Sequence, residues 1–546
     1  MKTANLLLCL CFILVSQHAL PQTLQVNKKV ATALRKVAPK DIEAHIRYLA
    51  DDKLLGRKPG TAGYQIAVDY VVNQFQELGV QPAGENNTYL QAVKLRKAVT
   101  GAQTAMHSQD SLGHIANLSD GQEYVIYPNP QEPEVAVQAS LVFAGYGISA
   151  PELGYDDYAG INAAGKIVVI LRGAPAKFES TVAAYNMDLH TILKNAAAHG
   201  AVGIIIGQPN PKAKLPNLAQ GIYSVLSPEG EVVVSRNYVS EQIKLLALVS
   251  NEVLLRFFSS AGLNYEQAAA SINKGIPVSA PLHTSVDATY TSAYQDVDSY
   301  NVVGKIEGSD PQLKNEYVVH SAHLDHVGIS TPVEGDSIYN GAHDNASGVA
   351  SLLEIAKVYA RLKEKPKRSV LLVMVTGEEM GLLGSAYFAG HPTVPAQSIV
   401  ADINTDMPTI IAPLLSVVAL GAEHSSLAKQ VAEASRYLGL DVETDPEPEQ
   451  NRFIRSDQYS FVSQGIPALH IKYGNKTPDG KNNLDVQVKA WRARYYHKPQ
   501  DDINGIFDFD AGKKYVQLNF LIGYQVAQNP EKPTWNSGDF FGKRFD

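Results

Sequence analysis

The hydrophobic and polar positions divide the chain into stretches with different periodicities. A helix is predicted for residues 29–51, and another follows the glycine-rich loop at 56–63. The second helix ends at Gly79, and its apolar face is formed by Ala67, Val71, Phe75 and Leu78. From about 120 to 285 short β-rich runs dominate, at 140–144, 166–171, 202–206 and 231–234, with one alanine-rich helical stretch at 192–199. This change predicts a β-rich domain that interrupts the main one.

From about residue 298 apolar runs and helical patterns alternate. Strands are predicted at 316–321, 369–375, 398–403, 415–420 and 468–471, and helices at 348–362, 425–438 and 457–464. The alternation predicts an α/β fold, with a mixed, largely parallel sheet and helices on both faces. The predicted main domain therefore comprises 24–118 and 291–530, the inserted domain 119–290, and a C-terminal tail 531–546.

The first residues are typical of a signal peptide, predicted at 1–19. Lys2 gives the positive start, Leu6 to Val15 the apolar stretch, and Ser16 or Ala19 a small residue for cleavage. No later run reaches about 18 uninterrupted apolar residues, so we expect a mature protein without an integral membrane segment, secreted or periplasmic.

Cysteine usage sharpens this prediction. The two cysteines, Cys9 and Cys11, both lie in the apolar stretch, so the mature chain is predicted to have neither a disulfide nor a thiol nucleophile. Export without disulfides favours a bacterial periplasm or medium. Lipid attachment at Cys11 is the alternative, but Leu10 is a poor match to the small residue required there.

Composition narrows the function classes. The 546 residues are 45% hydrophobic and 19% charged, as expected of a globular chain with two to four domains. The formal net charge is −8, and no cluster of Lys and Arg is interleaved with aromatic residues. Nucleic acid is therefore not an expected partner. No sequence feature specifies an oligomeric state.

Several of the side chains that can bind metals lie just past predicted strand ends, whereas Asp344 precedes the helix that starts near Gly348 and His497 lies far down the chain. Glu378 and Glu379 end an apolar run, where neighbouring side chains point in opposite directions, so one could bind a cation while the other reaches its water. In an α/β sheet the ligand crevice lies beyond the carboxyl ends of the strands. The other members of the set are His323, Asp325, Asp344, Asp406 and His497.

This donor set has a specific chemistry. Histidine nitrogens with carboxylate oxygens suit Zn²⁺, with Co²⁺ or Mn²⁺ as alternatives. One carboxylate can bridge two cations about 3.5–4 Å apart, and a water shared by them becomes a hydroxide nucleophile near neutral pH. A spare glutamate can take and return a proton.

Each residue taken alone has an ordinary structural explanation. His323 and His497 could be structural histidines, Asp344 a helix cap and Asp406 a turn residue before Pro408. The joint pattern, rather than any single position, favours a metal site.

Five motifs resemble, in order, those of the di-zinc aminopeptidases, the family that includes secreted bacterial leucyl aminopeptidases and glutamate carboxypeptidase II. The resemblance covers roughly 300–510, and the loop at 56–63 with its following helix also resembles that family. The motifs are His323-Leu324-Asp325, Gly341 to Gly348, Gly377-Glu378-Glu379, Asn404-Thr405-Asp406-Met407 and Tyr496-His497-Lys498-Pro499.

The resemblance implies a role for each position and two Zn²⁺ ions per chain. His323 and Asp406 would bind one zinc, Glu379 and His497 the other, and Asp344 would bridge them. Glu378 would be the general base and acid. Asp325 would orient His323, and Asp501 would support His497.

The predicted insertion resembles the protease-associated domain. The resemblance rests on Phe143 to Ile148, Asp157-Tyr158, Gly165 to Val169 and Ala197 to Gly203. In relatives such a domain shapes substrate access; a packing module is the alternative.

These inferences together predict a metallo-exopeptidase, an aminopeptidase that releases N-terminal residues from peptide substrates through a di-zinc-bound hydroxide. Tyr473 is a candidate donor to the developing oxyanion. Arg452 or Arg455 could meet a substrate carboxylate, which would make the enzyme a carboxypeptidase instead. A non-catalytic binding protein and a single-zinc glutaminyl cyclase are the remaining alternatives on this fold.

Overall fold

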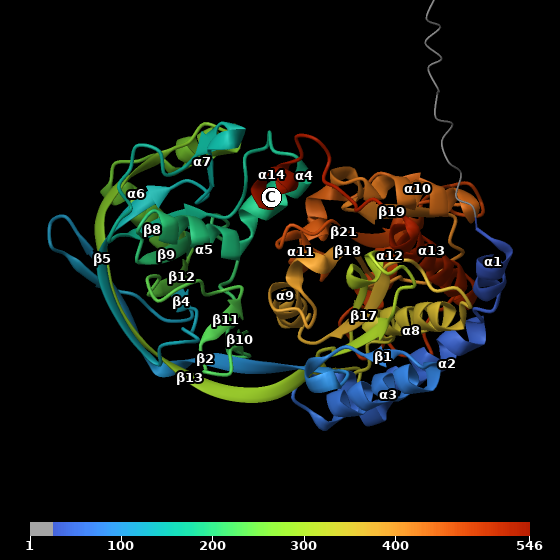
Figure 1. Cartoon of the computed structure of the whole chain (residues 1–546). Coiled ribbons are helices and arrows are strands. Elements are labelled where there is room, and N and C mark those ends of the chain that lie inside the picture. Colours follow the sequence, from blue (N-terminus) through green and yellow to red (C-terminus); the bar gives the residue numbers. More distant parts are fainter. Residues whose placement is uncertain (1–25, 546) are drawn as a thin grey trace, which may run out of the picture.

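The computed structural model describes residues 26–545, and the predicted signal peptide lies outside them. Two lobes lie side by side, joined along one edge by long strands (Figure 1). Among the helices of the described residues, none combines the length and apolarity needed to cross a bilayer.

Three N-terminal helices, α1 (Lys28–Arg35), α2 (Pro39–Leu49) and α3 (Ala62–Leu78), pack on the larger lobe. The single helix predicted over 29–51 is wrong: Pro39 begins α2, where its missing N–H is not needed, and Ala38 before it is extended. The α3 helix starts at the Thr61 cap and ends on Gly79, whose positive φ of 69° suits glycine.

The larger lobe contains the predicted α/β sheet. Its four central strands are parallel, in the order β17 (Ser369–Val375), β14 (Tyr317–His323), β18 (Ile399–Asn404) and β21 (Ala468–Tyr473). Beyond β21 lie β19 (Ser416–Leu420) and β20 (Asp441–Glu443); beyond β17 lie the end of β13 (Ser279–Ile306) and β1 (Gln81–Pro82). The mixed, largely parallel sheet is confirmed.

One predicted strand runs against the others. Strand β19 is antiparallel to β21. The segment between β18 and β19 contains no helix, and a parallel return normally requires a long, usually helical, crossover.

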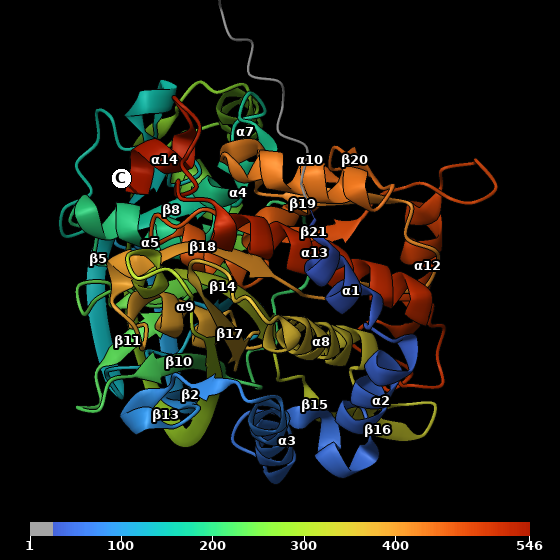
Figure 2. The same cartoon turned by 45° about the vertical axis from the view of Figure 1, so that its right-hand side comes forward.

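Helices cover both faces of this sheet, as predicted. Along β17, Val370, Leu372 and Met374 pack in one hydrophobic core, and Leu371, Val373 and Val375 in another. The first core includes α2, α3, α8 (Ser347–Arg361), α10 (Leu427–Tyr437) and α13 (Phe509–Gln528), of which α2, α8 and α13 lie together in Figure 2. The second includes α9 (Leu383–Gly390), α11 (Gln458–Val462) and α14 (Phe540–Phe545). Burial on both faces explains why β17 is apolar without interruption from Val370 to Val375.

Two long strands connect the lobes. Strand β2 (Leu90–Asp110) pairs antiparallel with β13 from Leu90 opposite Val302 to Asp110 opposite Thr284, along the lower edge of Figure 1. Residue 290, where the predicted insertion ends, lies inside β13. The predicted boundary therefore falls within a continuous strand instead of a linker.

The strands of the smaller lobe continue the same sheet through β13, and this lobe has its own hydrophobic cores. Parallel strands β5 (Glu134–Ala144), β8 (Ile167–Leu171), β9 (Gly203–Gly207) and β12 (Leu245–Val249) are followed by antiparallel β4 (Tyr124–Ile126). Helix α5 (Leu189–Ala198) packs in one core, and α6 (Asn251–Ser260) and α7 (Tyr265–Asn273) in the other. Its identity as a protease-associated domain stays a prediction.

The predicted tail contains a helix that contacts both lobes. Phe541 of α14 is fully buried, and the rings of Phe540 and Phe541 lie 5.4 and 6.0 Å from Tyr185 of α4 (Ser180–Met187). Arg544 pairs with Glu152 at 2.9 Å. Helix α14 thus lies beside α4 in Figure 1, where it packs the smaller lobe against the larger.

Candidate metal centre

The ends of three parallel strands position most of the site. In the sheet register His323, the last residue of β14, lies opposite Val375 of β17, and Ser321 lies opposite Asn404 of β18. The segments that follow β17 and β18 carry Glu378, Glu379 and Asp406. Parallel register therefore brings residues far apart in sequence to one edge.

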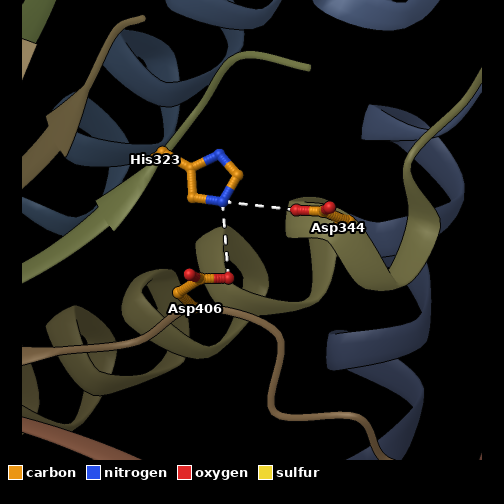
Figure 3. A group of neighbouring side chains, drawn as sticks. All are labelled: His323, Asp344 and Asp406. Carbon is orange, nitrogen blue, oxygen red and sulfur yellow. Dashed lines mark ion pairs between the residues drawn. The ribbon is translucent and has the colours of Figure 1, made fainter. Parts of the chain in front are cut away.

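A first donor group forms around His323. Its Nε2 lies 3.3 Å from Oδ1 of Asp344 and 3.5 Å from Oδ1 of Asp406 (Figure 3). All three side chains are buried. Asp344 comes from the turn 342–346 that leads into α8.

A second donor group shares Asp344. Nε2 of His497, which follows α12 (Leu484–Tyr495), lies 3.1 Å from Oδ2 of Asp344 and 3.2 Å from Oε2 of Glu379. The two oxygens of Asp344 thus face different imidazoles. All five residues predicted as metal ligands converge on one place.

The donor set fits metal ions. His323 Nε2 is buried and has no hydrogen-bond partner, although it faces two carboxylates. Ligand atoms of His323, Asp344 and Asp406 lie within 4.8 Å of one another, and so do those of His326, Asp344 and Glu379. Buried carboxylates gathered this closely require a cation, and mixed nitrogen and oxygen donors suit zinc.

Glu378 lies beside these groups and lines the same cleft. Burial, followed by the nearby carboxylates of Glu379 and Asp406 against the opposing pull of His323, raises the pKa of Glu378 well above its ordinary value. A carboxyl with a raised pKa, close to the donor groups and not needed as a ligand, is suited to proton transfer.

Asp325 supports the site differently from the expectation. Nδ1 of His323 lies 3.2 Å from the backbone carbonyl of Asp325, while the carboxylate is 4.0 Å away. That carboxylate instead accepts a hydrogen bond from the backbone N–H of Glu378 at 3.2 Å. The carbonyl therefore orients His323, and the carboxylate positions the Glu378 turn.

Asp501 and Tyr473 also require correction. The Asp501 carboxylate accepts hydrogen bonds from the backbone N–H groups of His343 and Asp344, so it holds the Asp344 turn rather than His497. The Tyr473 hydroxyl donates to the carbonyl of Ala412 at 2.9 Å. It is not free to stabilise an oxyanion.

Several residues of the site escaped prediction. Tyr496 lines the cleft beside Asp344, Glu378 and Asp406, whereas Tyr473 does not. His326 is fully buried, with Nδ1 2.7 Å from Oε1 of Glu379. The sequence signal for His326 was its place one residue after Asp325, in the segment that leaves β14. Arg455 also lines the cleft.

Residues 301–514 match the profile of Peptidase family M28. A "Probable zinc metalloprotease" of Pyrenophora teres f. teres (strain 0-1) is 25% identical over 265 residues, 43% of this chain and 52% of that protein. "Leupeptin-inactivating enzyme 1" of Streptomyces exfoliatus is 29% identical over 258 residues, 46% of this chain and 53% of that protein. The chain spans about half the length of these curated relatives.

A solved structure shows the same fold over most of both chains. The aminopeptidase from Aneurinibacillus sp. strain AM-1 superposes with a TM-score of 0.50, covering 92% of this chain and 97% of that one at 19% identity.

Proposed function

Because residues 301–514 belong to peptidase family M28, we propose that the chain is a metallo-exopeptidase, an aminopeptidase with two zinc ions. The observation that carries this proposal is Asp344, whose two carboxylate oxygens face His323 on one side and His497 on the other. Such a carboxylate is suited to bridging two cations. The shared fold with a protein described as an aminopeptidase supports the choice of exopeptidase class.

Each residue has a part in this proposal. His323 and Asp406 would hold one ion, Glu379 and His497 the other, and Asp344 both. Bound zinc would acidify a water and polarise the scissile carbonyl. Glu378 would accept the proton of the attacking water and return it to the leaving amine.

The surroundings of Glu378 support its role. The Asp325 contact fixes the turn that carries Glu378, and burial raises the pKa of its carboxyl above the ordinary value. Tyr496, at the same cleft, is the candidate donor to the oxyanion in place of Tyr473.

The test is the Glu378→Gln variant, with Glu364→Gln, an exposed glutamate, as the matched control. Loss of a positioned general base lowers turnover by about 10²–10⁴-fold. We expect the variant to retain two zinc ions per chain, measured by elemental analysis, and to lose turnover of aminoacyl anilides. Near wild-type turnover would remove Glu378 from the mechanism.

Chelation tests the dependence on metal, and the choice of substrate distinguishes an aminopeptidase from a carboxypeptidase. A chelator is expected to abolish hydrolysis of an aminoacyl anilide, and Zn²⁺ to restore it. Faster hydrolysis of an N-blocked dipeptide than of the anilide would instead support a carboxypeptidase.

We also propose export to the periplasm or medium, supported by the signal-like sequence at 1–19. N-terminal sequencing of the mature protein tests this, since an intact Met1 would contradict cleavage.

A further inference from the structure

The cleft beside the metal centre has a strongly basic wall. Asp344, Glu378 and Asp406 line the cleft, and so do four cationic side chains. The four come from three parts of the chain: two from the loop before α11, one from strand β21 and one from helix α12. They are Arg452, Arg455, Lys472 and Arg492, here called the basic wall.

Among the residues that the structure describes, Arg452 is the one member of the basic wall with a carboxylate oxygen within 4.0 Å of its charged nitrogens. Arg452 forms ion pairs with Asp445 and Glu447. Within residues 26–545, no carboxylate oxygen lies within 4.0 Å of the charged nitrogens of Arg455 or Arg492. Both guanidinium groups are therefore available to a ligand.

Lys472 adds a buried charge. The residue is 9% exposed, and its Nζ donates to the backbone carbonyls of Asp406 at 2.9 Å and Met407 at 3.1 Å. These carbonyls provide hydrogen bonds but no opposite charge. The cations thus repel one another in the cleft, and an anion there would relieve the repulsion.

The acidic part of the cleft does not supply that anion. Two divalent cations would take up the charge of its carboxylates, and those carboxylates point at the imidazoles. Arg492 is also held in place, with its guanidinium 4.8 Å from the ring centre of Tyr496. A fixed guanidinium with no acidic partner, beside the candidate reaction centre, matches the planar, bidentate geometry of a carboxylate.

We propose that the basic wall binds a substrate carboxylate, so that the enzyme acts on peptides carrying a carboxylate next to the scissile bond. This inference rests on the proposed peptidase function and names its substrate class. The carboxylate has two sources: the side chain of an N-terminal Asp or Glu, or the free C-terminus of a dipeptide.

Two substrate pairs distinguish these sources. Glutamyl and glutaminyl p-nitroanilide differ by a side-chain carboxylate, and Ala-Ala and Ala-Ala-amide differ by a terminal one. A charged hydrogen bond corresponds to about 10–100-fold in kcat/KM. We expect the zinc-loaded protein to prefer the carboxylate member of at least one pair by that factor. The preferred pair identifies the source.

Two variants test whether the basic wall causes the preference for the carboxylate substrate. Arg455→Met and Arg492→Met are expected to reduce the preference at least tenfold while the uncharged substrate is still hydrolysed. Arg494→Met is the matched control, because Arg494 lies on α12 but outside this cleft. Absence of preference in both pairs, or a preference that both variants retain, would overturn the proposal.

Binding gives a readout that does not depend on turnover. Glutarate and butyrate each offer one carboxylate to the metal centre, but only glutarate has a second for the basic wall. Calorimetry on the zinc-loaded protein is expected to show about tenfold tighter binding of glutarate, lost in Arg455→Met and Arg492→Met. Equal affinities would overturn the proposal that the basic wall binds a carboxylate. If the protein hydrolyses no peptide but still prefers glutarate, only the peptidase function is overturned.

Discussion

Arg57 allows the most detailed prediction of stability. It lies in the Gly- and Pro-rich loop before α3, and its guanidinium is fully enclosed, with the residue 1% exposed. It donates hydrogen bonds to four backbone carbonyls, those of Leu49, Leu324, Asn340 and Gly341, at 2.6–3.0 Å. These carbonyls belong to α2, to the segment leaving β14 and to the turn before Asp344.

The expected effect of Arg57→Met follows from these contacts. The variant keeps an apolar stem but leaves four carbonyls without their donor, at a cost of about 1 kcal/mol each, or roughly 4 kcal/mol in total. Burial lowers the pKa of Arg57 to about 10, which keeps it charged at neutral pH beside Asp344 and Asp325. At roughly 2 °C per kcal/mol for a large domain, the melting temperature should fall by about 8 °C.

The assay is thermal unfolding of the metal-free protein, which separates the fold from the effect of bound ions. Arg47→Met is the matched control, because Arg47 is an exposed arginine on α2 paired with Glu43, and its loss should stay within about 0.5 kcal/mol. If Arg57→Met melts within 2 °C of the wild type, the buried hydrogen bonds do not stabilise this loop as reasoned.

Three further predictions concern separate parts of the molecule. His326→Phe removes the donor to Glu379 and should weaken one metal site about 10–100-fold in a chelator titration, while unchanged affinity at both sites would contradict this role. Burial raises the pKa of Asp157 from 3.8 to about 7, so the folded protein loses the stability contributed by the protonated carboxyl as pH rises through that range. Asp157→Asn does not titrate, so its melting temperature relative to wild type should rise from pH 4 to 7. A difference that stays constant with pH would refute this prediction. Phe541→Ala should cost about 3–5 kcal/mol and speed hydrogen exchange in α14; unchanged exchange would show that Phe541 does not hold the helix.

The predictability of the fold followed the strength of the hydrophobic pattern. Strand β17 was predicted over the same residues, 369–375, because burial on both faces makes its sequence apolar from Val370 to Val375. The long strands β2 and β13 were not predicted as such, because polar residues alternate with apolar ones over lengths far beyond an ordinary strand. Pro39 was overlooked as the start of a new helix.

At the site, the strand-end pattern accounts for His323, Glu379 and Asp406. Parallel register brings these three together, because it aligns the strand ends regardless of their separation in sequence. Asp344, before α8, and His497, after α12, were assigned through the family resemblance. The roles of Asp325, Asp501 and Tyr473 depended on side-chain direction within loops. No periodicity encodes that direction, and the structure gives each of them a backbone partner instead.

The most direct test of the central claim is X-ray diffraction from crystals of the zinc-loaded protein, with anomalous data collected at the zinc edge. The account predicts two peaks on either side of Asp344, one beside His323 and Asp406 and the other beside Glu379 and His497. A single peak, or zinc bound away from these five residues, would contradict it.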